Sequence, residues 1–157
     1  MRIKGLVIDP LSKMPVVVLE DLNRERVLPI WIGAFEANAI ALTMEKISTP
    51  RPMTHDLIKN FLMRLDIQVD RIVVTDVRNN TFYAAIHCRR GDEALIVDSR
   101  PSDAIALALR MSSPIFVEDD VVRKAHELKD DESSENVENL RKWLEALTPE
   151  EMGKYKM

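Results

Sequence analysis

Residues 94–111 read ALIVDSRPSDAIALALRM and hold the clearest change of structural pattern in this chain of 157 residues. The apolar run 94–98 is short and ends on an acidic residue, which is typical of a β-strand. From residue 101 onward apolar residues recur at helical spacing, and Pro101 suits the first turn of a helix. The stretch therefore predicts a strand that leads through a polar turn directly into a helix.

The rest of the sequence also alternates between strand-like and helix-like segments, separated by Gly, Pro, Asn and Asp. In chain order we predict strands at 2–9, 14–20, 26–32, 67–77, 81–90, 94–98 and 114–118, and helices at 34–47, 55–65, 101–111, 119–128 and 137–147. Asn79 and Asn80 tolerate positive φ and favour a tight hairpin turn. In helix 55–65 the apolar stripe that includes Leu57 and Phe61 is expected to face the core. These elements indicate an α+β protein with a mixed, largely antiparallel sheet and helices packed on it.

A short repeat indicates that the strand-to-helix pattern occurs twice. The residues AIAL at 39–42 recur at 104–107, and each copy follows three predicted strands. The repeat predicts an internal βββα duplication in which the helix-start turns 33–38 and 98–103 are equivalent and lie near one another. The alternative is chance, because short words of Ala, Ile and Leu recur in many amphipathic helices.

Length and composition indicate one globular domain. Hydrophobic residues make up 46% of the chain and charged residues 31%, which excludes a disordered protein. We predict an α+β domain over 1–128, a polar linker over 129–136 and a C-terminal helical tail over 137–157. The amphipathic helix at 137–147 could pack across a second copy, so we expect a homo-oligomer, most simply a dimer.

Cysteine content and hydropathy bear on the compartment. Cys88 is the one cysteine of the chain, and a lone thiol fits a reducing compartment because it forms no internal disulfide. No apolar run approaches the ~20 residues that span a bilayer, and no signal-peptide pattern precedes the first strand. We therefore expect a cytoplasmic protein without a membrane segment. The net charge of −4 shows no overall basic footprint, but acidic residues gather at 130–135, which leaves room for a local basic face.

The turn at 98–103 concentrates two acids, two hydroxyls and an arginine in six residues. A helix N-terminus favours phosphate, and Arg100, Ser99 and Ser102 would add side-chain donors. Asp98 and Asp103 are hard oxygen ligands that suit Mg²⁺ or Mn²⁺. The structural alternative has equal weight: serine caps helices, aspartate in the first turn offsets the helix dipole, and arginine pairs with either acid.

Three residues elsewhere are further candidates. Glu36 follows Gly33 among apolar neighbours, where a carboxylate is expected either to have its pKa raised or to take a cationic partner. His55 would serve as a general base or a metal ligand, and Arg51 would help to hold a phosphate backbone. The alternatives are a solvent-exposed acid in a first helical turn for Glu36 and an exposed residue at a capped helix start for His55.

Three words in this order carry a family resemblance: LPIWIG at 28–33 followed by Glu36, RPMTHDL at 51–57, and DSRPSDAIAL at 98–107. Together they resemble the bifunctional nuclease domain family, and the match covers nearly the whole chain. The resemblance implies a compact α+β domain and a nuclease that acts on both RNA and DNA, with nucleic acid as its partner.

The expected mechanism rests on chemistry, since the resemblance assigns no catalytic set. Phosphodiester hydrolysis needs an activated water and stabilisation of the charge on phosphate, and carboxylate-held Mg²⁺ or Mn²⁺ supplies both. We expect Asp98 and Asp103 to hold the metal, Glu36 to be a catalytic residue or a third ligand, and His55 to be the base or acid. The phosphate-binding set would be Arg100, Ser99, Ser102 and Arg51. The alternatives are a non-catalytic protein that binds a phosphorylated small molecule or another anion, and a regulatory module that acts by oligomerisation.

Overall fold

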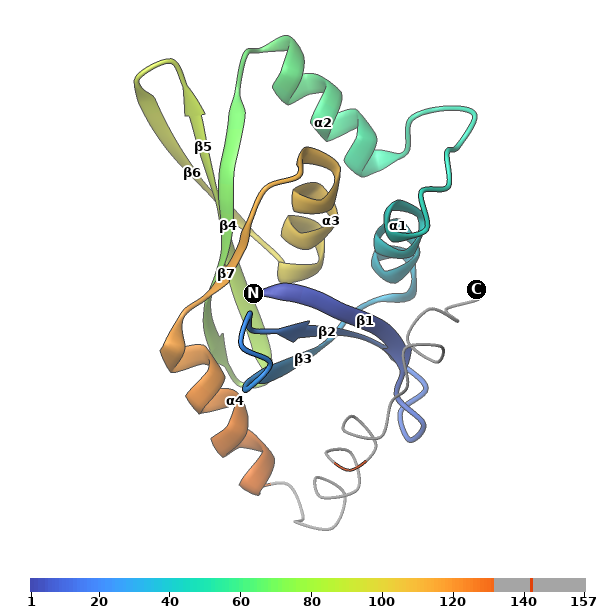
Figure 1. The fold of residues 1–157 in the computed structure, drawn as a ribbon, viewed down its shortest axis with the longest axis vertical. Helices are drawn as coiled ribbons and strands as arrows, with labels where there is room; N and C mark the ends of the chain where they lie inside the picture. Colours follow the sequence, from blue (N-terminus) through green and yellow to red (C-terminus); the bar gives the residue numbers. More distant parts are fainter. Residues whose placement is uncertain (132–141, 143–157) are drawn as a thin grey trace.

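The computed structural model describes residues 1–131 and residue 142 of the chain. In chain order the elements are β1 (Arg2–Ile8), β2 (Pro15–Glu20), β3 (Val27–Trp31), α1 (Ala34–Met44), α2 (Thr54–Arg64), β4 (Gln68–Arg78), β5 (Thr81–Arg90), β6 (Glu93–Ser99), α3 (Pro101–Met111), β7 (Ile115–Val117) and α4 (Asp119–Asp131). The described strands form two sheets, and α3 lies between the second sheet and α1 (Figure 1).

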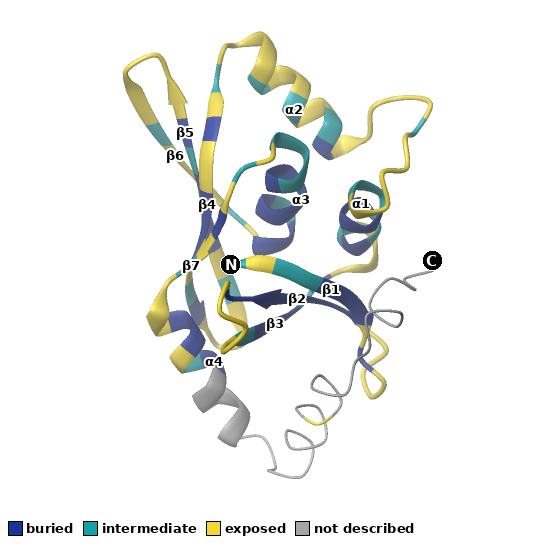
Figure 2. Cartoon of the chain, in the orientation of Figure 1, coloured by how far each residue is buried: buried dark blue, intermediate teal, exposed yellow. Residues whose placement is uncertain are grey.

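The first sheet has the order β1-β2-β3 and is antiparallel throughout. Its central strand β2 is buried along its whole length (Figure 2). A run of valine and leucine suits such a strand, because both of its faces are covered. Val17 and Leu19 belong to the main core on one face, while Val16 and Val18 form a smaller cluster with Trp31 on the other.

The second sheet has the order β6-β5-β4-β7, in which β7 runs parallel to β4 and the other pairs are antiparallel. β4 and β5 are joined by Asn79 and Asn80, whose φ angles are 48° and 58°. These angles confirm the predicted tight hairpin turn. The face of this sheet that carries Val74, Ala84 and Ile86 packs with α3 in the main core.

α3 is the central helix of the described fold. All residues from Ala104 to Ala108 are buried, because the second sheet, α1 and α2 surround the helix (Figure 2). Three of these five residues are alanine, and their small side chains allow the neighbouring helices to approach closely. The central position of α3 places the polar turn that precedes it next to α1 and α2.

The α+β class is confirmed, with one difference from the expectation: the strands form two separate sheets and not one. The three strands before α1 form one sheet, and the four strands after α2 form the other. The order β1β2β3α1, then α2, then β4β5β6α3 agrees with the expected βββα repeat. The duplication itself stays a prediction.

α4 continues to Asp131 and so reaches three residues into the segment that was expected to be a polar linker. The rest of that linker and the predicted tail at 137–157 lie outside the described residues, except for Lys142. The helix on which the dimer prediction rests is part of that tail. Within the described residues, no helix combines the length and the apolar character that crossing a bilayer requires.

Candidate active site

The first turns of α1 and α3 are joined by one arginine. Arg100 comes immediately before α3, and its Nη2 lies 2.8 Å from Oε1 of Glu36, which is in the first turn of α1. The Nε of the same guanidinium donates a hydrogen bond of 2.7 Å to Oδ2 of Asp103. The predicted proximity of the two helix-start turns is therefore confirmed by a direct ion pair between them.

His55 enters the same group from α2. It is the buried residue of that helix, and its Nε2 lies 2.9 Å from Oδ1 of Asp103. An ionised carboxylate only accepts hydrogen bonds, so Nε2 carries the proton and Nδ1 of the neutral ring is the acceptor. Every fully buried side-chain nitrogen or oxygen in the described part of the chain has a partner, and the structure records none for Nδ1. Nδ1 is therefore not fully buried, although the side chain of His55 is only 10% exposed.

We call Glu36, His55, Arg100 and Asp103 the cluster. Burial raises the pKa of Asp103, but the hydrogen bonds from Arg100 and His55 more than offset this effect and hold the pKa below its ordinary value. The hydrogen bond to Asp103 is the main reason why the pKa of Arg100 is raised. Both groups are therefore charged at neutral pH. The side chain of Arg100 is 65% exposed, so the cluster presents a cation to solvent above largely covered acids.

Gly33, which precedes α1, leaves room for the Glu36 carboxylate. A Cβ built on Gly33 would overlap Oε2 of Glu36. The backbone of Gly33 is extended, with a φ of −70°, so it is the close approach and not the backbone that calls for glycine here. Gly33 thus allows Glu36 to turn back over the helix start toward Arg100.

Replacement of Gly33 by alanine is expected to displace the Glu36 carboxylate from Arg100 while the fold is kept. The atom that must move is the end of a flexible side chain, so we expect a loss of less than about 1 kcal/mol in the free energy of unfolding. Urea unfolding and a crystal structure of the variant measure the two effects. Gly91→Ala is the contrasting variant: no atom lies within 4 Å of an added Cβ, but the φ of +58° strains an alanine, so it should lose stability without moving the Glu36 carboxylate. A Gly33→Ala variant that keeps the Glu36–Arg100 contact unchanged would contradict this account of Gly33.

Three other residues of the turn at 98–103 do not belong to the cluster: Asp98, Ser99 and Ser102. Asp98 is exposed on β6 and pairs with Ala85, whereas the next residue, Ser99, pairs with the buried Ala84 on the face that α3 covers. Because side chains alternate along a strand, Asp98 projects to the opposite face of the sheet from Asp103.

The Ser99 hydroxyl donates to the carbonyl oxygen of Arg100, and Ser102 is buried in the first turn of α3.

The expected metal ligands do not converge in the described part of the chain. No three His, Cys, Asp or Glu side chains among these residues are grouped so as to hold a metal ion. Glu36 and Asp103 both face the guanidinium of Arg100, and a cation between them would have to displace it. The donors therefore do not fit a resident divalent ion in this arrangement.

A second polar group lies beside the cluster. Asp56 follows His55 on α2, and its Oδ1 accepts a hydrogen bond of 2.6 Å from Nε of Arg110 in the last turn of α3. Sequence reasoning did not find this pair. An acid in a first turn and an arginine in a last turn both satisfy the helix dipole, and residues 54 positions apart carry no local signal of contact.

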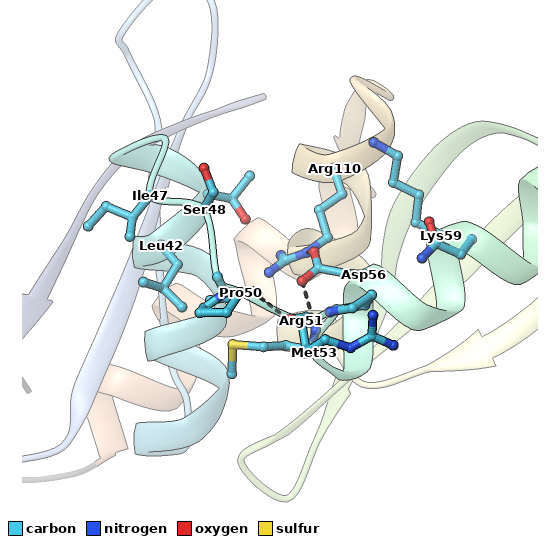
Figure 3. Close-up of a pocket in the computed structure, with 13 residues that line it drawn as sticks. Leu42, Ile47, Ser48, Pro50, Arg51, Met53, Asp56, Lys59 and Arg110 are labelled. Carbon is cyan, nitrogen blue, oxygen red and sulfur yellow. Dashed lines mark hydrogen bonds and ion pairs between the residues drawn. The ribbon is translucent and has the colours of Figure 1, made fainter.

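The Asp56–Arg110 pair forms one wall of a pocket with a volume of about 360 Å³. Figure 3 shows the pocket between α2, the end of α3 and the connector that follows α1. Arg51, which we expected to bind phosphate, lines this pocket and takes no part in the ion pairs of the cluster. The structure thus divides the expected site residues between the cluster, the pocket and the opposite face of the sheet.

Comparison with known proteins agrees with the family resemblance. The family model described as Bifunctional nuclease domain matches residues 17–130. An uncharacterized protein of Mycobacterium tuberculosis is 36% identical over 159 residues, which cover 96% of this chain and 95% of that protein. A protein named Bifunctional nuclease 1 from Oryza sativa subsp. indica is 26% identical over 105 residues, which cover 65% of this chain and 31% of the rice protein. The chain belongs to the bifunctional nuclease domain family.

Proposed function

We propose that this protein hydrolyses phosphodiester bonds of RNA and DNA at the cluster of Glu36, His55, Arg100 and Asp103. The observation that carries the proposal is the bond between His55 and Asp103, because the carboxylate fixes Nε2 as the donor and leaves Nδ1, which is not fully buried, as the acceptor. A histidine oriented by a carboxylate is a common general base. The family membership and the rice relative support a nuclease rather than another hydrolase.

Each residue has a separate role in the proposed reaction. A water molecule attacks phosphorus and gives its proton to Nδ1 of His55, while Asp103 stabilises the imidazolium that forms. The bond from phosphorus to the leaving oxygen breaks, and that oxygen takes a proton from solvent. Arg100 pairs with the phosphate oxygens as negative charge develops on them. Glu36 orients Arg100 through the 2.8 Å contact.

No step of this reaction is routed through a metal, because the carboxylates of the cluster face Arg100. A nuclease assay tests the dependence on Mg²⁺ or Mn²⁺ that the sequence led us to expect. Labelled single-stranded and double-stranded RNA and DNA are incubated with the purified protein in EDTA, Mg²⁺ or Mn²⁺. Activity retained in EDTA supports the reaction as written, and activity that requires the ion would assign a metal to the site.

Arg100→Gln is expected to lower turnover by about 10-fold to 100-fold. The variant loses the cation that faces phosphate, and the effect stays below that of an enclosed donor because Arg100 is largely exposed. Hydrolysis of a labelled oligonucleotide under single-turnover conditions measures the change. Arg71→Gln is the matched control, since Arg71 pairs with His87 in the sheet register, outside the cluster. Equal loss in both variants, or none in either, would contradict the assignment of Arg100.

A further inference from the structure

The pocket beside the cluster is lined by three cationic side chains from three parts of the chain. Arg51 lies in the connector between α1 and α2, Lys59 on α2 and Arg110 on α3 (Figure 3). Among the lining residues Asp56 is the one acid, and it is already paired with Arg110. Positive charge therefore exceeds negative charge in a pocket of about 360 Å³, which is within the range of small-ligand sites.

Arg110 differs from a surface arginine because its side chain is only 7% exposed. Its Nε donates to Asp56, and its Nη1 donates to the carbonyl oxygens of Ala39 and Ala106. The structure records no partner for Nη2 in the described residues, where no fully buried side-chain nitrogen or oxygen lacks one. Nη2 is therefore not fully buried, and Arg110 lines the pocket. A buried guanidinium fixed on two sides presents its third nitrogen at little entropic cost.

The other pocket walls suit a phosphorylated ligand. Ser48 and Thr49 in the connector add hydroxyl groups, and Asn60 on α2 adds a side-chain amide. Leu42 and Ile47 form an apolar wall apart from Arg110 (Figure 3). A ligand with a charged phosphate and a less polar remainder would match both halves of this lining.

We propose that this pocket binds a phosphate group, held by Arg110, Lys59 and Arg51. The source that the arrangement favours is a neighbouring phosphate of the nucleic-acid strand under cleavage, and to that extent the inference rests on the proposed function. Asp103 and Arg110 lie on the same face of α3, seven residues apart, which is about 10 Å along the axis. Arg110 also reaches back to Ala106, so its guanidinium is nearer to the cluster than that. A separation below about 10 Å is within reach of a nearby phosphate of the same strand, because successive nucleotides of one strand rise by only ~3.4 Å.

The experiment compares wild type with the double variant Arg51→Gln, Lys59→Gln and with a matched control, Lys13→Gln, Arg24→Gln. The control removes the same two kinds of charge from exposed turns of the first sheet. Arg110 is left intact because its removal endangers the fold. Binding of inorganic phosphate and of a single-stranded oligonucleotide with hydrolysis-resistant linkages is measured by calorimetry at several salt concentrations.

We expect the double variant to bind both probes roughly tenfold more weakly, while the control binds as wild type does. For the oligonucleotide, the dependence of log K on log salt should fall by about 1 to 1.5, since each cation on a single strand contributes about 0.7. Weaker binding of inorganic phosphate alone would assign the pocket to a free phosphate compound. Unchanged binding of both probes in the double variant would overturn the proposal.

The same variants separate this inference from the nuclease proposal. Arg100→Gln should lose turnover yet bind inorganic phosphate in the pocket as wild type does. If wild type shows no hydrolysis but the double variant still loses phosphate binding, the proposed function fails and the pocket assignment stands. If hydrolysis depends on the cluster while phosphate binding ignores Arg51 and Lys59, the pocket assignment fails and the proposed function stands.

Discussion

Turnover of nucleic acid is expected to fall by about 10²-fold to 10⁴-fold when His55 is replaced by glutamine. Glutamine approximates the size of the ring and keeps a polar contact to Asp103, but it cannot accept the proton of the attacking water. The substrate-binding groups are unchanged, so we expect the loss in kcat and little change in KM. Single-turnover hydrolysis at saturating oligonucleotide, with circular dichroism to confirm folding, measures the effect.

Two matched variants show whether the loss belongs to the His55–Asp103 pair. His87→Gln makes the same chemical change on β5, outside the cluster, and should keep wild-type turnover. Asp103→Asn should lower turnover because an amide no longer fixes Nε2 as the donor, whereas Asp98→Asn should not. The double variant of His55 and Asp103 should be scarcely worse than His55→Gln alone, since the two residues act as one unit. Full activity in His55→Gln would remove the general base from the proposal.

Replacement of Arg110 by methionine is expected to destabilise the protein by about 2–4 kcal/mol. Methionine fills a similar space, but Asp56 loses its cation and two carbonyl oxygens lose their donor. Asp56 is 34% exposed and regains some hydration, so the cost stays below that of a fully buried charge. Urea and thermal unfolding measure it, with a fall in Tm of roughly 5–12 °C.

The pH dependence of this loss identifies its cause. Burial raises the pKa of Asp56, but Arg110 and the backbone N–H of Met53 outweigh it and hold the pKa below its ordinary value. The interaction therefore stabilises the fold above that ordinary value and is lost as pH falls through the folded-state pKa. The gap between wild type and Arg110→Met should narrow below about pH 4. Arg90→Met, which breaks an exposed pair with Glu93, should cost less than about 1 kcal/mol, and an equal loss in both variants would contradict the role given to Arg110.

Much of the fold could be predicted because its signals are local. Pro101 after a short apolar run marks the start of α3 at the observed residue, and Asn79 with Asn80 marks the hairpin. The separation into two sheets could not be predicted, since pairing between strands depends on contacts far apart in the chain. Helical spacing also gave a wrong expectation for α2. Its apolar stripe was expected in the core, but Leu57 is 50% and Phe61 is 60% exposed. Periodicity shows which residues share a face, but it does not show which face the neighbours cover.

The residues of the candidate site could be predicted only in part, because local sequence signals show their chemistry and not their positions. Glu36, His55, Arg100 and Asp103 were selected for their chemistry, and the fold brings all four together. Asp98 has the same chemistry as Asp103, but strand alternation sends it to the other face of the second sheet. Arg110 had no distinguishing signal, because its importance arises from burial by helices that are distant in sequence.

The contact between Glu36 and Arg100 also joins the two halves of the chain. Glu36 belongs to the first βββα unit and Arg100 to the second, while His55 comes from the helix that joins the two units. Neither unit alone holds the four groups, so the reactive geometry is a property of how the units are seated against each other. The main hydrophobic core contains residues of both units, so its packing holds Glu36 and Arg100 in this alignment. The geometry of the cluster therefore depends on the alignment of the two halves of the chain.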